Sequence, residues 1–317
     1  MEASVETVLI AGIESVVGAN LAASLSDRYQ AVGLSLSLPL SVAGSQTSVS
    51  HGHDWEMVRN EVASIRPQRI VYCGTAAHST WQNPPPWISV AQSETAIRNW
   101  TRAAREFECR LTVISSDAVF TGPWMFHKED STCLCASAQA QAIRSAEILV
   151  AQYCPDALLV RTNAYGWSPE STGRCWISET LADLKSHSAG PFDHLRYATP
   201  ILTTDLTEIL EQAWQNNLHG IYHVAGAERV NPNQFVEQLA NEFGLPEPQP
   251  VNGNSLSGRP TGFGRGETSL HTNKIRKDLN IAMPMLADGL QRLRGQKQND
   301  YCEQLEIGSQ PVHEKVA

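Results

Sequence analysis

A serine and an aspartate stand side by side where an apolar run gives way to a polar loop, in the segment ISSDAVFTG at residues 114–122. The hydroxyl of Ser116 could donate a hydrogen bond to a ligand carbonyl and polarise it, or it could only cap the strand. The carboxylate of Asp117 could contact a substrate, or it could fix the loop by accepting hydrogen bonds from backbone N–H groups. We predict that this loop faces a substrate and that Ser116 is the catalytic candidate.

A second candidate site is the glycine-containing turn AGIESVVGANL near the N-terminus, which has the pattern Gly12-x-x-Ser15-x-x-Gly18. Glycines at such a turn let backbone amides at a helix N-terminus approach a pyrophosphate, which a Cβ atom would keep away. Serine replaces the middle glycine, so the segment fits either a cofactor-binding turn for NAD or NADP or a plain strand-to-helix turn. The next strand ends in LSLSLPL, where Ser35 and Ser37 could bond a ribose; with neither an acid nor an arginine there, it does not indicate which cofactor binds.

A third pair of polar side chains ends the apolar segment ALLVRT at residues 157–162. Ligands of open α/β sheets bind outside the carboxyl ends of the strands, which is where Arg161 and Thr162 would lie. We therefore predict that both contact the substrate. The alternative is that Arg161 belongs to a structural ion pair.

These candidates need a sheet that brings strand ends together, and the alternation of strand and helix patterns predicts one. The expected strands cover residues 5–11, 29–36, 69–74, 109–116 and 157–162, and the expected helices cover residues 15–28, 54–65, 89–107 and 136–153. Strands that are apolar on both faces and alternate with helices are typical of a parallel sheet covered on both sides. The sequence thus predicts a doubly wound, Rossmann-like α/β fold, with Asp54 as the N-cap of its helix.

The pattern loosens after residue 165, where turn-rich segments precede a helix at 205–216, a strand at 220–226 and a helix at 233–243. We expect a Rossmann-like dinucleotide-binding domain at residues 1–165. A smaller α/β substrate lobe, partly interleaved with it, would cover residues 166–293. The polar end of the chain, residues 294–317, has no apolar pattern and predicts a flexible tail.

Composition excludes several classes of partner. The 317 residues carry a net charge of −9, which disfavours nucleic acid as a ligand. No apolar stretch reaches the ~20 residues of a membrane span, and the N-terminus lacks a basic leader, so we expect a cytoplasmic protein that does not bind membranes. The cysteines are odd in number and scattered, which predicts reduced thiols. Cys133 and Cys135 lack the spacing of a zinc site, so no metal is expected.

In its order of segments the chain resembles the extended short-chain dehydrogenase/reductases, and most closely the dTDP-4-dehydrorhamnose reductase (RmlD-like) family. The resemblance rests on the Gly12/Gly18 turn and on residues 54–78, 114–122, 128–130, 158–167, 197–210, 220–228 and 269–275. It implies an NAD- or NADP-dependent reductase of a nucleotide-linked keto sugar. It also implies that Ser116 is the loop hydroxyl that polarises the ketone, that Gly74 and Thr75 face the cofactor, and that Arg259 contacts a substrate phosphate.

The same resemblance reveals a missing pair. In that family a tyrosine donates the proton, and a lysine four residues later stabilises its tyrosinate form and so lowers the phenol pKa. Aligned through Glu147, these positions fall on Gln139 and Ile143, and no Tyr-x-x-x-Lys occurs anywhere in the chain. Gln139 cannot transfer a proton, and Ile143 has no charge.

Three functions therefore stand open. The chain could be a reductase with an altered proton donor. It could be a non-catalytic subunit that binds a nucleotide and a protein partner, similar to the regulatory beta subunits of methionine adenosyltransferases. An epimerase or dehydratase of a nucleotide sugar ranks last, because that chemistry depends on the same missing Tyr/Lys pair.

Overall fold

A seven-stranded parallel sheet forms the centre of the computed structural model, which describes residues 5–36, 39–50, 52–81, 90–169, 172, 175–190, 192–249 and 262–306. The strand order is β3-β2-β1-β4-β5-β6-β9. The strands are β1 (Thr7–Ala11), β2 (Gln30–Ser35), β3 (Gln46–Val49), β4 (Arg69–Tyr72), β5 (Arg110–Ser116), β6 (Leu158–Thr162) and β9 (Gly220–His223). Except in β3 and the first half of β9, the apolar side chains of the strands are buried, as the continuous apolar runs require.

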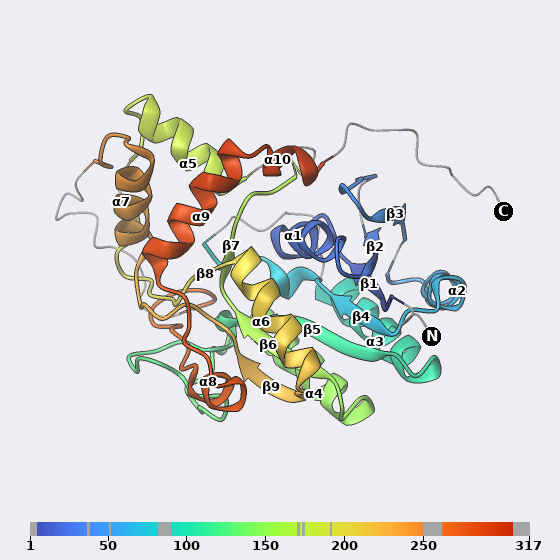
Figure 1. The fold of residues 1–317 in the computed structure, drawn as a ribbon. Coiled ribbons are helices and arrows are strands. Elements are labelled where there is room, and N and C mark those ends of the chain that lie inside the picture. The colour runs from blue at the N-terminus through green and yellow to red at the C-terminus, as the bar shows by residue number, and fades with distance from the viewer. Residues whose placement is uncertain are drawn as a thin grey trace.

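Helices cover both faces of this sheet (Figure 1). On one face lie α1 (Val16–Leu25) and α6 (Thr203–Gln215), which pack on each other. On the other lie α2 (Trp55–Ile65), α3 (Val90–Glu106) and α4 (Ala138–Tyr153). The side chain of Asp54 accepts a hydrogen bond from the N–H of Met57 and caps α2, as predicted. The predicted doubly wound fold is confirmed.

The sheet reverses its strand order between β1 and β4, because β2 and β3 continue to one side and β4, β5, β6 and β9 to the other. In such a sheet the crevice outside the carboxyl ends of the strands, at the reversal point, is where ligands bind. The glycine turn follows β1, Gly74 follows β4, Ser116 ends β5 and Thr162 ends β6. The fold therefore brings these candidate residues to one edge of the sheet.

A smaller group of elements lies beyond that edge (Figure 1). Apart from the short helix α8 (Asn273–Leu279), which packs beside β9, it contains α5 (Trp176–Lys185), α7 (Pro232–Phe243) and α9 (Leu286–Gln298), with the short pair β7 (Ala164–Tyr165) and β8 (Ile201–Leu202). Its apolar residues belong to the same buried cluster as those of α1 and α6. The second half of the chain also returns to the main sheet, because β9 pairs with β6.

The end of the described chain differs from the predicted tail. Residues 294–298 continue α9, and α10 (Tyr301–Gln304) follows. The hydroxyl of Tyr301 donates a hydrogen bond to the side-chain oxygen of Asn20 at 3.1 Å, and Leu305 is fully buried. These contacts, together with a hydrogen bond from the N–H of Ala43 to the carbonyl oxygen of Gln304 at 2.7 Å, hold the polar segment in place. Residues 307–317 lie outside the described part.

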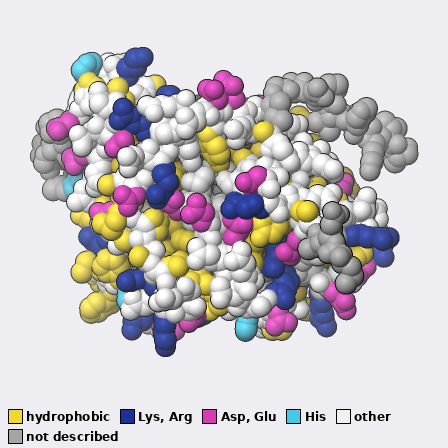
Figure 2. Space-filling model, in the orientation of Figure 1, with side chains coloured by type: hydrophobic (Ala, Val, Ile, Leu, Met, Phe, Trp, Pro, Cys, Tyr) yellow, Lys and Arg dark blue, Asp and Glu magenta, His cyan; other side chains and the backbone are white. Residues whose placement is uncertain are grey.

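Charged side chains of both signs are interspersed over the face seen in Figure 2. This face therefore carries no broad field of one sign of the kind that attracts a phosphate backbone. Within the described residues, no helix has the length and apolar character needed to cross a bilayer.

Candidate functional site

The glycine turn after β1 has no room for side chains at two of its positions. Gly12 has φ +100°, and a Cβ atom there would lie 2.0 Å from the carbonyl oxygen of Cys73. A Cβ on Gly18 would lie 2.1 Å from the carbonyl oxygen of Gly12. Both positions therefore require glycine, because the atoms in the way belong to backbone. The predicted turn thus places strand β1, helix α1 and the exit of β4 in close contact.

Ser15, which replaces the middle glycine, is the N-cap of α1. Its hydroxyl donates to the carbonyl oxygen of Gly12 at 2.7 Å and accepts from the N–H of Gly18 at 2.9 Å. The remaining amides in the first turn of this ten-residue helix have no partner within the helix. They and the helix dipole favour an anion, so the residues present fit a dinucleotide pyrophosphate. That Ser15 itself contacts the cofactor stays a prediction.

Glu14 lies in the same turn, although the sequence motifs do not single it out. Both of its carboxylate oxygens lie 3.1 Å from the N–H of Leu36, and Ser35 donates from its hydroxyl at 3.4 Å. An acid therefore stands at the carboxyl end of β2 although the strand itself supplies none. The only signal was a charged residue inside a glycine turn.

The exit of β4 presents Gly74 and Thr75 towards the same edge. A Cβ on Gly74 would lie 2.5 Å from the ring of Tyr72, and the hydroxyl of Thr75 donates to that of Ser93 at 2.8 Å. Burial, with a further contribution from Glu14, raises the pKa of Tyr72 well above its ordinary value. Tyr72 is therefore neutral at physiological pH. Contact of Gly74 and Thr75 with a cofactor stays a prediction.

Ser116 and Asp117 are both buried at the end of β5. The hydroxyl of Ser116 accepts from the N–H of Ala118 at 3.1 Å and donates to Asp117 at 3.4 Å. The other oxygen of Asp117 accepts from the amide of Asn163 at 3.0 Å and from the hydroxyl of Thr268 at 2.8 Å. The serine thus caps the short helix η2 (Asp117–Val119) while lying next to a hydrogen-bonded carboxyl group.

Burial raises the pKa of Asp117 to about 6, although hydrogen bonds from Thr268, Asn163 and Ser116 act in the opposite direction. Asn163 is held in turn, because its side-chain oxygen accepts from Ser79 at 2.5 Å. This arrangement can keep a proton beside the loop hydroxyl close to neutral pH. Asn163, Thr268 and Ser79 come from distant parts of the chain, so no local motif could have identified them.

Arg161 is engaged in a buried ion pair. Its guanidinium donates to the two carboxylate oxygens of Glu147 at 2.9 and 2.7 Å, and Ser115 donates to Glu147 at 2.6 Å. This geometry favours the structural alternative for Arg161, since its strongest donors face α4 rather than the crevice. Thr162 is buried, and its hydroxyl has no hydrogen-bond partner among the described residues. Its contact with a substrate stays a prediction.

Gln139 and Ile143, the positions of the missing pair, both lie on α4. The side chain of Gln139 is exposed, whereas Ile143 packs against a small apolar cluster that includes Val119 and Phe120. The nearby cation Arg144 donates to the carbonyl oxygen of Cys135 at 2.7 Å and so holds the loop before α4. The hydrogen bonds described for Ser116 and Asp117 come from no tyrosine or lysine.

The predicted phosphate contact Arg259 and the predicted ribose contact Ser37 lie outside the described residues. Another arginine, Arg196, has Asp117 among its charged neighbours. Arg196 forms an ion pair with Asp193 at 3.0 Å, and burial lowers its pKa, with Arg265 and Asp117 among its charged neighbours. Arg196, which the motifs did not single out, is thus paired with an acid close to Asp117.

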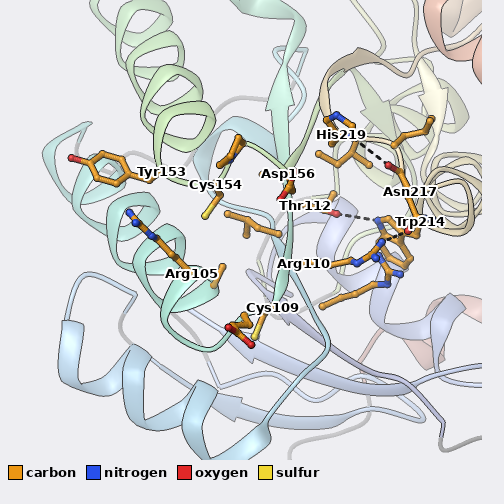
Figure 3. A pocket seen from close by; sticks show the side chains of 18 residues that line it. Arg105, Cys109, Arg110, Thr112, Tyr153, Cys154, Asp156, Trp214, Asn217 and His219 are labelled. Atoms are coloured by element: carbon orange, nitrogen blue, oxygen red, sulfur yellow. Dashed lines mark hydrogen bonds between the residues drawn. The ribbon is translucent and has the colours of Figure 1, made fainter.

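A cavity of about 640 Å³ opens on the opposite edge of the sheet (Figure 3). Its lining includes Arg110, the first residue of β5, whereas Ser116 is the last. Trp214 of α6 donates to the hydroxyl of Thr112 at 3.0 Å in its wall, and Cys109 and Cys154 face it from the ends of the neighbouring helices. This cavity therefore lies at the other end of the strands from the glycine turn and Ser116.

The chain matches a known family over almost its whole length. The sequence model of the family described as RmlD substrate binding domain covers residues 6–298. Two solved structures share the fold at low identity. The dTDP-4-dehydrorhamnose reductase of Bacillus anthracis str. Ames in complex with NADP has a TM-score of 0.76 at 18% identity and covers 93% of this chain and 100% of that one. The Bordetella bronchiseptica enzyme WbmH in complex with NAD+ has a TM-score of 0.73 at 15% identity and covers 94% and 99%.

The chain also matches a curated protein over part of its length. Methionine adenosyltransferase 2 subunit beta of Xenopus laevis is 21% identical over 199 residues, which are 61% of this chain and 60% of that protein. The chain thus spans less than two thirds of the length of the curated relative that it matches.

Proposed function

Because the chain belongs to the family described as RmlD substrate binding domain, we propose that its crevice binds a nicotinamide dinucleotide beside a nucleotide-linked keto sugar. The observation that carries this proposal is the turn in which Gly12 and Gly18 leave no space for a Cβ atom, at the same sheet edge as Ser116. A turn of this geometry at a helix N-terminus suits a pyrophosphate. The family's Tyr/Lys pair is absent from this chain, so we expect this chain to be a weaker reductase than proteins that carry the pair.

Each residue has a distinct task in this proposal. The first amides of α1 hold the pyrophosphate, and Ser116 orients the ketone oxygen by a hydrogen bond. Asp117 lies 3.4 Å from the serine hydroxyl, and its raised pKa of about 6 lets it hold a proton there in mildly acidic solution. A reduced nicotinamide supplies a hydride when it is bound.

The missing pair predicts a slow reductase rather than an inert protein. A positioned general acid contributes roughly 10²- to 10⁴-fold, or about 3 to 5 kcal/mol, and the orientation of two bound ligands contributes separately. A slow rate is therefore expected if both ligands bind.

The test is the oxidation of NADH and of NADPH with a dTDP-4-keto-6-deoxy sugar. We expect a rate above the blank that falls at least about tenfold in Ser116→Ala, which removes the hydroxyl from the ketone. The double variant Gln139→Tyr, Ile143→Lys returns the pair and should raise the rate by roughly 10²-fold or more. A rate equal to the blank in the folded wild-type protein and in the double variant would end the reductase proposal.

A second candidate is a regulatory subunit that binds a nucleotide without turning it over. It is favoured by the absent Tyr/Lys pair together with the match to a methionine adenosyltransferase beta subunit. Such a protein should gain thermal stability from NADH while absorbance at the nicotinamide band stays constant with a keto sugar present. Steady oxidation of NADH would exclude it.

A further inference from the structure

Glu14 occupies the place at which Rossmann-like folds recognise the adenosine ribose. An acid at the carboxyl end of the second strand accepts hydrogen bonds from ribose hydroxyls, whereas a 2′-phosphate needs donors or an arginine there. Here β2 ends at Ser35 without an acid, and Glu14 of the glycine turn reaches across to it. Its two oxygens lie equally close, 3.1 Å, to the N–H of Leu36.

The backbone donor at Leu36 is consequently taken by a carboxylate. A 2′-phosphate in this position would compete with Glu14 for that N–H and would place its negative charges against the carboxylate. A free 2′-hydroxyl needs only an acceptor, which Glu14 offers. The same residue thus favours one dinucleotide and opposes the other.

We propose that Glu14 is a specificity-determining residue that makes the crevice select NAD(H) over NADP(H). This inference rests on the proposed dinucleotide site, and it names the cofactor class that this site takes. The fold alone does not decide the matter, since the similar solved structures hold NADP in one case and NAD+ in the other.

The surroundings of Glu14 support the proposal. Tyr72 and Cys73 are buried next to the turn, and both groups are neutral at physiological pH, because burial and the charge of Glu14 raise the pKa of each. Neither side chain can offset a second negative charge. The backbone of Gly12 is fixed in place. Its N–H donates to the carbonyl oxygen of Leu34 at 2.7 Å, and the carbonyl oxygen of Cys73 fills the space beside its Cα atom.

The experiment measures the dissociation constants of NADH and NADPH by calorimetric titration of the full chain. Three proteins are compared: the wild type, Glu14→Gln, and the control Glu208→Gln, which removes the same charge from an exposed position on α6. We expect the wild type and the control to bind NADH at least about tenfold more tightly than NADPH. Glu14→Gln should reduce this ratio to about threefold or less, mainly by tighter binding of NADPH.

The outcomes separate this inference from the proposed function. Equal affinities in the wild type, or a preference for NADPH, would overturn the role of Glu14 and leave the dinucleotide site intact. The wild-type ratio needs no substitution, so an unfolded Glu14→Gln protein would not prevent this decision. An unchanged ratio in a folded Glu14→Gln protein would also overturn the role. Absence of saturable binding of either dinucleotide to the wild type and to Glu14→Gln would remove both proposals.

Discussion

Asp117 lies beneath the loop hydroxyl of Ser116 without contact with solvent, and burial raises its pKa to about 6. The unfolded chain releases this proton near pH ~3.9, whereas the folded protein retains it up to about pH 6. Between these values the folded state binds more protons, so the free energy of unfolding falls as the pH rises. A shift of this size is equivalent to about 3 kcal/mol.

Asp117→Asn removes the titrating carboxyl group. The free energy of unfolding of the variant should therefore not show this decrease as the pH rises. We expect the free energy of unfolding of the wild type, relative to the variant, to decrease by about 2 kcal/mol between pH 4 and pH 7, because the unfolded carboxyl group is already half ionised at pH 4. Guanidinium unfolding of both proteins at four pH values provides the measurement. Burial and the charge of Arg161 lower the pKa of the buried His223 to about 3, so this group decreases the free energy of unfolding as the pH falls. His223 is present in both proteins, and its contribution therefore cancels in the comparison. A difference that is constant with pH would contradict the raised pKa.

Two glycines with positive φ, only one of them in the glycine turn, allow the effect of a steric clash to be separated from that of backbone strain. Gly12 and Gly122 both have a positive φ, +100° and +116°, but a Cβ atom on Gly12 would overlap a carbonyl oxygen, whereas one on Gly122 would meet nothing within 4 Å. Gly122→Ala should cost about 1 to 2 kcal/mol from backbone strain alone. Gly12→Ala should cost at least ~2 kcal/mol more, because backbone must move. Equal losses in thermal or denaturant unfolding would show that the turn can relax.

At the scale of elements, the pair Glu147–Arg161 joins helix α4 to strand β6 just below the crevice. Removal of one partner leaves the other charged and buried, so we expect Glu147→Leu to lower the free energy of unfolding by about 3 to 5 kcal/mol. The double variant Glu147→Leu, Arg161→Met replaces both charges with apolar groups and should recover most of that loss. A double-mutant cycle in urea measures both. A double variant that is less stable than Glu147→Leu alone would argue against this role.

Elements with a strong local signal could be predicted from the sequence, and those that depend on tertiary contacts could not. The apolar runs of β1 and β5 and the N-cap Asp54 of α2 are local features. The strand β3 was missed because its segment QTSV is polar and half-buried at the sheet edge. The end of the chain was taken for a tail because its anchors are tertiary contacts: Tyr301, Leu305 and a hydrogen bond from the N–H of Ala43 to the carbonyl oxygen of Gln304.

The site divides in the same way. Gly12, Gly18 and Ser116 belong to short motifs whose meaning is local, and the structure brings them to one sheet edge. The partners of Asp117 and the contact of Glu14 with the end of β2 join segments far apart in sequence. No spacing rule could have found them, because only the folded sheet places them together.

At the scale of the whole molecule, the two halves of the chain are interleaved, since β9 and α6 of the second half complete the sheet layers of the first. The carboxyl edge of the sheet therefore draws residues from both halves, as the bond from Thr268 to Asp117 demonstrates. A ligand bound there should stabilise the molecule as one unit. A free ligand concentration one hundred times the dissociation constant should raise the free energy of unfolding by about 2.7 kcal/mol.

The central claim is that the dinucleotide crevice persists although the proton-transfer pair is absent. Calorimetric titration of NADH into the wild-type chain tests it most directly. We predict saturable binding to a single site, abolished or strongly weakened in Gly18→Val, whose side chain would enter the turn. Absence of saturable binding at millimolar NADH, in protein whose circular dichroism shows that it is folded, would contradict the account.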